Sequence, residues 1–244
     1  MIKLEKNLSP LFLNPSVVVT LTNTFKTHET SVWNIDEIKE PLLELSYGKC
    51  AYCECDLREE SKYMEVEHFE DKKNNPDKVV VWDNLLPSCK RCNGAKSTHD
   101  VISNPIINPF LENPVNHLKL THYRFIGTTN VGTETIGVVD LNHTERAVNK
   151  RFKIGNKLLE TIEVLGEKLQ LYLDKPITQR KNKLLGVLEA ILLECQEYAE
   201  YTATTSTILH SSVKFQEIKI EVETAGLWSQ RFDDLFTNSK RFIL

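Results

Sequence analysis

Two pairs of cysteines, each with two residues between its members, constrain the fold of this chain more than any other feature. Cys50 and Cys53 form the first pair, and Cys89 and Cys92 form the second. In a C-x2-C knuckle both thiolates bend toward one tetrahedral ion, and two knuckles supply the four ligands of a closed structural Zn²⁺ site. One knuckle alone is weak evidence, whereas two in one short stretch are strong evidence. The sequence therefore predicts a zinc site that joins two separate segments.

Disulfides, or a set of unlinked buried thiols, would also account for these cysteines. The opening "MIKLEKNLSP" has no apolar core of a signal peptide, and no apolar run approaches the ~20 residues of a membrane span. We therefore expect a cytoplasmic protein without membrane contact. Because disulfides are disfavoured in the cytoplasm, they rank below zinc, and unlinked buried thiols rank below zinc as well. Cys55 is not included among the expected zinc ligands, because C-x-C spacing fits a single ion less readily. Cys195 lies on an apolar helical face and is expected to be a small buried hydrophobe.

The stretch between the knuckles carries polar residues that a structural zinc site does not need. "MEVEHF" alternates as a strand and contains Glu67 and His68. "VVVWDNLLP", which includes Asn84, is expected to contain a second extended element. "CKRCNGAKS" is expected to open a helix in which Asn93 and Lys96, three residues apart, share a face. A hairpin and a helix held by zinc would bring Glu67, His68 and Asn93 together.

This module resembles an HNH endonuclease domain of the ββα-metal type, in its zinc-knuckle form. The family pattern is an acidic residue with His, then Asn before Leu, then C-x2-C followed by His or Asn and by Lys three residues later. The sequence contains "EH", "DNLL" and "CKRCNGAK" in that order, over about a quarter of the chain. The runs "MIKLEK", "KCAYCE", "VEHFEDK", "WDNLLPSCKRCN" and "VVDLNHTERAVNKR" further resemble the PtuB-type subgroup. Its members are HNH effectors paired with an ABC-type ATPase, PtuA, in bacterial Septu and retron antiphage defence.

The resemblance implies a role for each polar residue of the motif. His68 would be the general base, and Glu67 and Asn93 would hold a catalytic Mg²⁺ or Mn²⁺, although many relatives have His in place of Asn93. Asn84 would orient the loop and the His68 ring, and Lys96 would hold a substrate phosphate. Two departures stand next to the histidine. Asp71 occupies a position where the family often has Pro, and Glu70 is either an extra metal contact or has no role.

The rest of the chain predicts an α+β protein in three parts. These are an N-terminal arm and helix (1–48), the zinc-framed HNH module (49–105), and a β-hairpin plus a helical region that we expect to dock a partner (106–244). Within the arm, "SVVVTLTNTF" is expected to be a strand or an extended segment. Asn34 and Asn142 have the spacing of helix capping boxes, Pro41 is expected to break or kink its helix, and "TIGVVDLN" is expected to be the second strand of the hairpin.

Net charge argues for help from a partner in binding nucleic acid. The whole chain carries a formal net charge of -4, and residues 49–100 contain 9 Lys/Arg against 11 Asp/Glu. Binding of a DNA or RNA substrate, between which the sequence does not choose, would then use a partner's surface. The main alternative function is a zinc-framed binding module without nuclease activity. A thiol redox protein does not explain the second knuckle.

Overall fold

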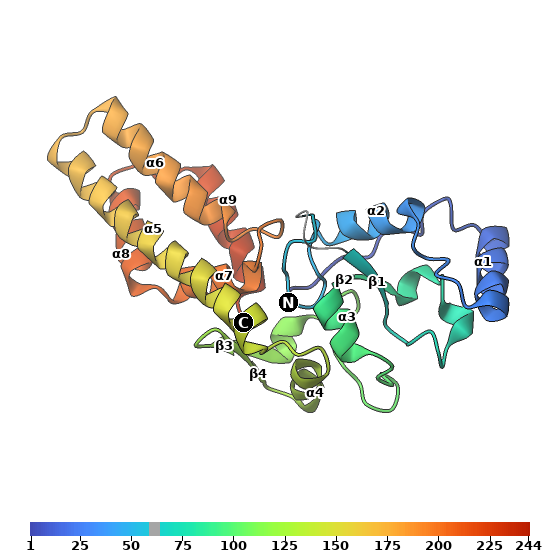
Figure 1. Cartoon of the computed structure of the whole chain (residues 1–244). Helices are drawn as coiled ribbons and strands as arrows, with labels where there is room; N and C mark the ends of the chain where they lie inside the picture. The colour runs from blue at the N-terminus through green and yellow to red at the C-terminus, as the bar shows by residue number, and fades with distance from the viewer. Residues whose placement is uncertain (59–63) are drawn as a thin grey trace. The chain divides into compact units, whose positions relative to one another are not determined.

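The computed structural model describes residues 1–58 and 64–244, and it divides into two compact units, Met1–His143 and Thr144–Leu244. Figure 1 follows the chain from the first unit, in blue to green, into the helical second unit, in yellow to red. The mixed α+β class with a mainly helical C-terminal half is confirmed. The expected division into residues 1–48, 49–105 and 106–244 stays a prediction.

The first unit holds the cysteine knuckles, two hairpins and four helices. Its helices and strands are α1 (Pro15–His28), α2 (Asp36–Leu45), β1 (Met64–His68), β2 (Leu85–Cys89), α3 (Lys90–Lys96), β3 (Leu118–Thr121), β4 (Arg124–Gly127) and α4 (Asn130–Val138). Short 3-10 turns stand at Pro76–Lys78 (η1), Trp82–Asn84 (η2) and Pro114–Asn116 (η3).

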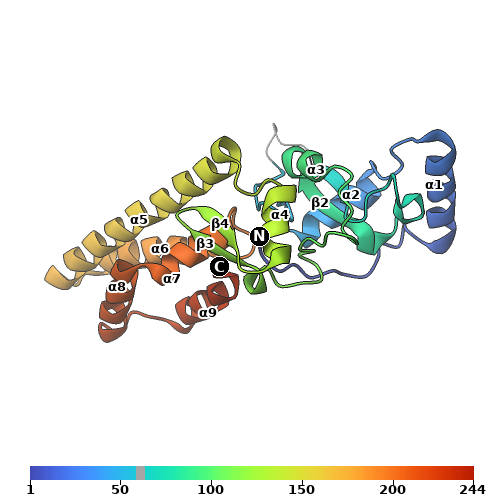
Figure 2. The same ribbon diagram turned by 90° about the horizontal axis from the view of Figure 1, so that it is seen from below.

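Strands β1 and β2 and helix α3 form the ββα unit that the sequence predicts. The strands are antiparallel, with Glu67 opposite Leu86 and His68 opposite Leu85. Helix α3 packs against both strands, and Figure 2 shows it beside β2. Its N-cap is Cys89, whose sulfur accepts a hydrogen bond from the backbone N–H of Cys92 at 3.5 Å. The second knuckle and the start of the helix are thus one local structure.

Three expectations for the N-terminal arm are wrong: an extended "SVVVTLTNTF", a cap at Asn34 and a break at Pro41. The segment "SVVVTLTNTF" is helical, because Asn14 caps the backbone of Ser16 and Val17 and Pro15 occupies the first helical turn. These local signals outweigh its β-branched composition. In α2 the N-cap is Ile35 rather than Asn34, and the helix continues through Pro41 to Leu45.

The second hairpin is shorter than expected and lies entirely within "LKLTHYRFIG". His122 and Tyr123 both have positive φ, at 48° and 63°, and form the two-residue turn between β3 and β4. The first half of the segment expected as its second strand, residues 135–138, ends helix α4, which Thr129 caps by accepting from the Gly132 N–H, and the second half is a turn. The N-cap position of α5 is Val148 rather than Asn142, whose amide pairs with the backbone N–H and C=O of Phe125.

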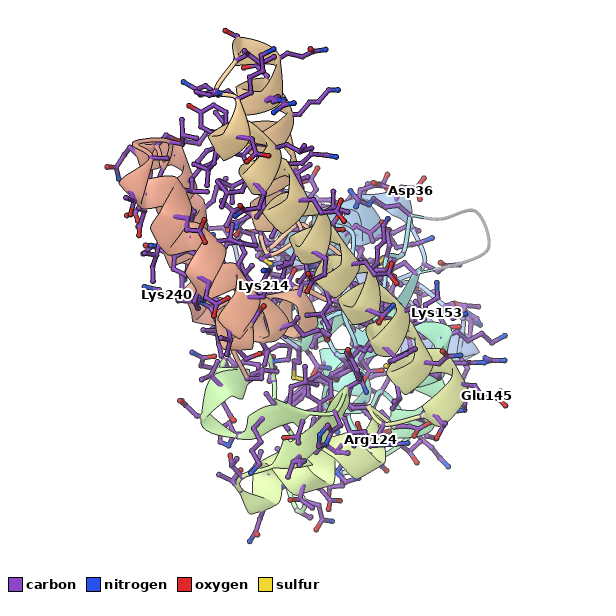
Figure 3. The ribbon with its side chains drawn as sticks, turned by 90° about the vertical axis from the view of Figure 1, so that its left-hand side faces the viewer. Asp36, Arg124, Glu145, Lys153, Lys214 and Lys240 are labelled. Atoms are coloured by element: carbon purple, nitrogen blue, oxygen red, sulfur yellow. The ribbon has the colours of Figure 1, made fainter. Side chains whose placement is uncertain are left out.

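The second unit is a bundle of helices with its own apolar core. After a π-helical turn, η4 (Thr144–Val148), it contains α5 (Asn149–Asp174), α6 (Thr178–Leu193), α7 (Thr202–Ser211), α8 (Val213–Thr224), α9 (Gln230–Ser239) and the 3-10 turn η5 (Lys240–Phe242). Helices α5 and α6 lie side by side (Figure 1), and α7 and α8 also pack on α5. Figure 3 shows Glu145 in η4, just before α5, and the exposed Lys153 on α5.

Apolar residues at helical spacing build this core largely as expected. Leu158, Ile162, Leu165 and Leu169 of α5 are buried against α6, α8 and α9, and Cys195 is fully buried among them. The sequence pattern i, i+3, i+4 also includes Phe152 and Leu159, but both lie outside this core, because Phe152 is 49% exposed and Leu159 is 39% exposed. Across the described residues, no helix combines the length and the apolar character that crossing a membrane requires.

Candidate active site

The four knuckle cysteines converge on one point of the first unit. The sulfur atoms of Cys50, Cys53, Cys89 and Cys92 all lie within 4.8 Å of one another, and Sγ of Cys53 is 3.7 Å from Sγ of Cys89. A tetrahedral Zn²⁺ with Zn–S bonds of about 2.3 Å spaces its sulfurs by about 3.8 Å. The donor set therefore fits a structural zinc ion. Cys55 lies outside this group of four, as expected.

The crowding of these thiols is itself an argument for a bound cation. Hydrogen bonding to Cys50 raises the pKa of the Cys92 thiol well above its ordinary value. Four thiolates cannot share this small volume without a positive charge to offset their repulsion. The Arg91 guanidinium supplies part of this positive charge, because its Nη2 donates a hydrogen bond to Sγ of Cys92 at 3.2 Å. Arg91 also reaches the backbone carbonyl of Asp140, which joins the knuckle to the segment after α4.

His68, at the end of β1, is held in the form that a general base requires. Its Nε2 donates a hydrogen bond to the carbonyl of Val79 at 2.9 Å, which leaves Nδ1 as the nitrogen that can accept a proton. Burial lowers the pKa of the imidazole to about 4, so the ring is neutral at pH 7. Trp33 packs edge-on against the ring, with centroids 4.6 Å apart, and fixes its plane.

Glu67 is a buried carboxylate with a buried lysine beside it. Its Oε1 lies 2.7 Å from Nζ of Lys96, which also donates to the backbone carbonyl of His68 at 2.9 Å. Burial raises the pKa of Glu67 to about 7, and the Lys96 charge opposes that rise. Lys96 is only 2% exposed. The structure thus places the lysine expected at a substrate phosphate in an internal ion pair instead, and its phosphate role stays a prediction.

Asn93, on α3, contacts a second acidic residue of β1. Its Nδ2 donates to Oε2 of Glu65 at 2.7 Å, so its Oδ1 is the oxygen that can face a cation. The sequence reasoning missed Glu65. The strand alternation in "MEVEHF" contains the signal, because Glu65 and Glu67 are two residues apart and lie on one face of the strand.

A cavity of about 310 Å³ brings the expected residues together. Its lining residues are Glu67, His68, Asp71, Lys72, Lys73, Asn93, Ser97 and Thr98. Buried Oε1 of Glu67 has no well-aligned hydrogen-bond donor among the described residues, despite its close ion pair. That oxygen and the Asn93 amide are hard donors of the kind that Mg²⁺ or Mn²⁺ prefers, so the residues present fit a divalent ion.

Asn84 organises the loop that follows His68. Its Oδ1 accepts from the backbone N–H of Glu70 at 2.8 Å, and its Nδ2 donates to the carbonyls of Glu70 and Lys78 at 3.0 and 3.2 Å. These bonds tie both ends of the 70–78 loop, and the next residue is Val79, the partner of His68. Asn84 is 6% exposed and does not line the cavity. Its place therefore suits an orienting role rather than contact with substrate.

The remaining residues next to the histidine belong to this loop. Asp71 accepts from the backbone N–H groups of Lys73 and Asn74 and so shapes the turn in which the family often has Pro. Glu70 forms an ion pair with Lys78 at the loop's other end. The sequence reasoning also missed Trp33 and Val79. Neither carries a local signal, because they reach His68 from distant parts of the chain.

We predict that zinc removal unfolds the first unit and spares the second, because the helical core in 144–244 is formed without the knuckles. Cys53→Ala should lower bound zinc below one ion per chain and remove one of two thermal transitions, followed by circular dichroism and metal analysis. Cys195→Ala is the matched control and should keep its zinc. A single transition that is unchanged by Cys53→Ala would contradict the assignment.

Asn84→Ala should loosen the 70–78 loop, since it removes three hydrogen bonds and leaves buried backbone groups unpaired. We expect a stability loss of about 1–3 kcal/mol and faster amide exchange across residues 69–79, measured by hydrogen–deuterium exchange. Asn74→Ala removes a single side-chain bond of the same loop, the one to Asp71, and serves as the control. Equal exchange in both variants would show that Asn84 does not hold the loop.

The Glu67 carboxyl should titrate near pH 7 in zinc-loaded protein without Mg²⁺ or Mn²⁺, as followed by the ¹³C shift of its carboxyl carbon. A pKa raised from 4.5 means that this group's contribution to stability is present below pH 4.5 and is lost as pH rises through 7. Lys96→Met should raise the pKa further, whereas Lys73→Met, at the exposed lysine of the same cavity, should change it little. A titration near pH 4.5 in wild type would refute the burial argument.

Comparisons with known proteins agree with this geometry. The HNH endonuclease family profile matches residues 50–99, which include both knuckles and most of the residues discussed from β1 to α3. A Septu protein PtuB of Bacillus thuringiensis is 43% identical over 226 residues, covering 92% of this chain and 88% of that protein. A Septu protein PtuB of Bacillus mycoides (strain KBAB4) is 26% identical over 167 residues, covering 53% of this chain and 55% of that protein. No solved structure matches the chain significantly.

Identity of this extent, over nearly the whole of both chains, shows the family. With a four-cysteine cluster beside Glu67, His68 and Asn93, and with a matching domain profile, the chain belongs to the PtuB proteins of Septu systems and carries an HNH endonuclease domain.

Proposed function

We propose that this protein is a metal-dependent endonuclease that hydrolyses phosphodiester bonds in DNA or RNA. The observation that carries the proposal is the cavity lined by Glu67, His68 and Asn93, with a neutral imidazole beside a buried carboxylate. A neutral base and hard oxygen donors in one cavity are what hydrolysis of a phosphodiester by an activated water requires.

Each of the residues at the site would have a separate role in phosphodiester hydrolysis. Nδ1 of His68 would take the proton from the attacking water, while the Val79 carbonyl keeps the other nitrogen protonated. Glu67 and Asn93 would hold a Mg²⁺ or Mn²⁺ ion, which when bound polarises the scissile phosphate and stabilises the leaving oxygen. Asn84 would keep the loop, and with it the Val79 carbonyl, in place. In-line attack would leave a 3′-hydroxyl and a 5′-phosphate.

We further propose that the protein is the effector nuclease of a bacterial antiphage defence system and acts in the cytoplasm with an ABC-type ATPase. The relatives named as Septu proteins support the defence context. The first unit holds 15 Lys/Arg against 20 Asp/Glu, which favours a partner that helps to present nucleic acid. We expect the ATPase to dock on α8, and the exposure of Val213 and Ile220, seven residues apart at 72% and 62%, supports that choice of helix.

His68→Ala should abolish cleavage, because His68 is the imidazole among the described residues that line the cavity, and it is neutral at pH 7. Cleavage is measured on plasmid DNA and on RNA with Mg²⁺ or Mn²⁺, using the chain alone and the chain co-purified with the protein of a neighbouring ATPase gene. His99→Ala is the matched control, since His99 also pairs with a backbone carbonyl, at 2.7 Å, but lies outside the cavity.

Zinc content and the thermal transitions should be unchanged in both histidine variants. Retained cleavage by His68→Ala would remove the proposed mechanism. Binding of nucleic acid by wild type without any metal-dependent cleavage, in either preparation, would favour the zinc-framed binding module instead.

A further inference from the structure

To bind a substrate phosphate, the cavity needs a positively charged side chain. The structure limits which lysines can supply it. Among the described residues that line the cavity, the cations are Lys72 and Lys73. Lys96, the lysine suggested by the motif, does not line it and is paired with Glu67. A buried ammonium with one carboxylate and one carbonyl as partners has little capacity left for a further anion.

Lys72 differs from Lys73 in how it is held. Its Nζ lies over the Trp33 ring, 5.1 Å from the centroid, and the side chain is half-buried. In the part of the chain that the structure describes, no carboxylate forms an ion pair with it. Lys73, by contrast, is exposed. A cation over an aromatic face is ordered without being neutralised, which is the state that phosphate binding favours.

Trp33 links this cation to the proposed base. The same indole contacts the His68 ring edge-on at 4.6 Å, and its other neighbour is Phe25 of α1, at 5.6 Å between centroids. Lys72 also lies close enough for its charge to oppose protonation of His68 and to favour ionisation of Glu67. One aromatic side chain from the segment between α1 and α2 thus fixes both a cation and a base at the cavity.

We propose that Lys72, held over the face of Trp33, binds a backbone phosphate of the nucleic-acid substrate, and that Trp33 is the positioning residue for both Lys72 and His68. The inference rests on the proposed nuclease function and assigns the phosphate contact to Lys72. It gives the N-terminal arm a part in the active site, although Trp33 lies outside the HNH motif. The affinity for nucleic acid then depends on an aromatic residue that does not touch the substrate.

Binding tests this assignment apart from catalysis. The full chain carrying His68→Ala is titrated against fluorescein-labelled oligonucleotides, as single-stranded DNA, duplex DNA and single-stranded RNA, over a range of salt concentrations. Adding Lys72→Ala should weaken binding about tenfold, the effect of one charge-assisted contact. The slope of log K against log salt should fall by about 0.7 for a single strand or 0.9 for a duplex, the loss of one phosphate contact.

Lys72→Arg should restore most of the affinity and the slope, because the guanidinium also stacks on an aromatic face. Lys73→Ala is the matched control: it removes the same charge from the next residue and the same cavity, and should change affinity clearly less. Equal effects of Lys72→Ala and Lys73→Ala, or an unchanged salt slope with Lys72→Ala, would overturn the assignment.

Trp33 is tested through its coupling to Lys72. Trp33→Leu should weaken binding nearly as much as Lys72→Ala. The double variant should bind only slightly more weakly than Lys72→Ala alone. Trp33→Phe should recover most of the affinity. Additive losses would instead mean that Trp33 acts on the fold alone. In the cleaving protein, Lys72→Ala should raise KM more than it lowers kcat.

The outcomes separate this inference from the proposed function. Wild type that cleaves while Lys72→Ala binds normally overturns the Lys72 assignment and leaves the nuclease in place. If the salt slope depends on Lys72 but the protein never cleaves, the phosphate site is supported and the proposed nuclease function is refuted. Failure of the His68→Ala chain to bind any of the probes, both alone and co-purified with the protein of the neighbouring ATPase gene, overturns the phosphate site.

Discussion

The convergence of four cysteine sulfurs is the constraint on which the candidate site depends. Cys50 and Cys53 lie on one side of β1 in the chain, and Cys89 and Cys92 lie on the other, at the start of α3. A ββα unit of this size has too little apolar core to fix a helix on a two-stranded hairpin. A zinc ion held by the four cysteines would provide that connection, and Asn93 directly follows the last of these cysteines. The zinc frame would therefore also set the position of the Asn93 amide, which we propose as a ligand of the catalytic metal.

Buried charge is the second organising feature. The first unit buries Glu67 and Lys96 as a pair between β1 and α3, and removal of either partner would leave an uncompensated charge. Within this pair the pKa of the Glu67 carboxyl lies close to neutral pH, so a hard cation could replace Lys96 as its partner. His68, one residue further along, is kept neutral by the same burial. Two adjacent residues thus reach states suited to metal binding and to proton transfer because both side chains are buried.

Much of the site was predictable from sequence because its chemistry is local. The C-x2-C spacing, the "EH" pair in an alternating strand and the helix opening at Cys89 are all signals that span only a few residues. What the sequence did not reveal depends on distant contacts. Trp33 reaches His68 from outside the motif, and Val79 accepts its hydrogen bond from the far end of a loop. Lys96 shares a helix turn with Asn93, yet tertiary packing turns it inward to Glu67. Local signals also misled outside the site, where capping by Asn14 made a β-branched segment helical.

The chemistry of the cleaved ends tests the central claim most directly. Zinc-loaded protein, alone and with its co-purified neighbour, would be incubated with end-labelled DNA and RNA, with and without Mg²⁺ or Mn²⁺, and the product termini identified. Water activated by His68 predicts 5′-phosphate and 3′-hydroxyl ends that form only when the divalent ion is present. Ends bearing a 3′-phosphate or a cyclic phosphate, or cleavage that is indifferent to the divalent ion, would contradict the account.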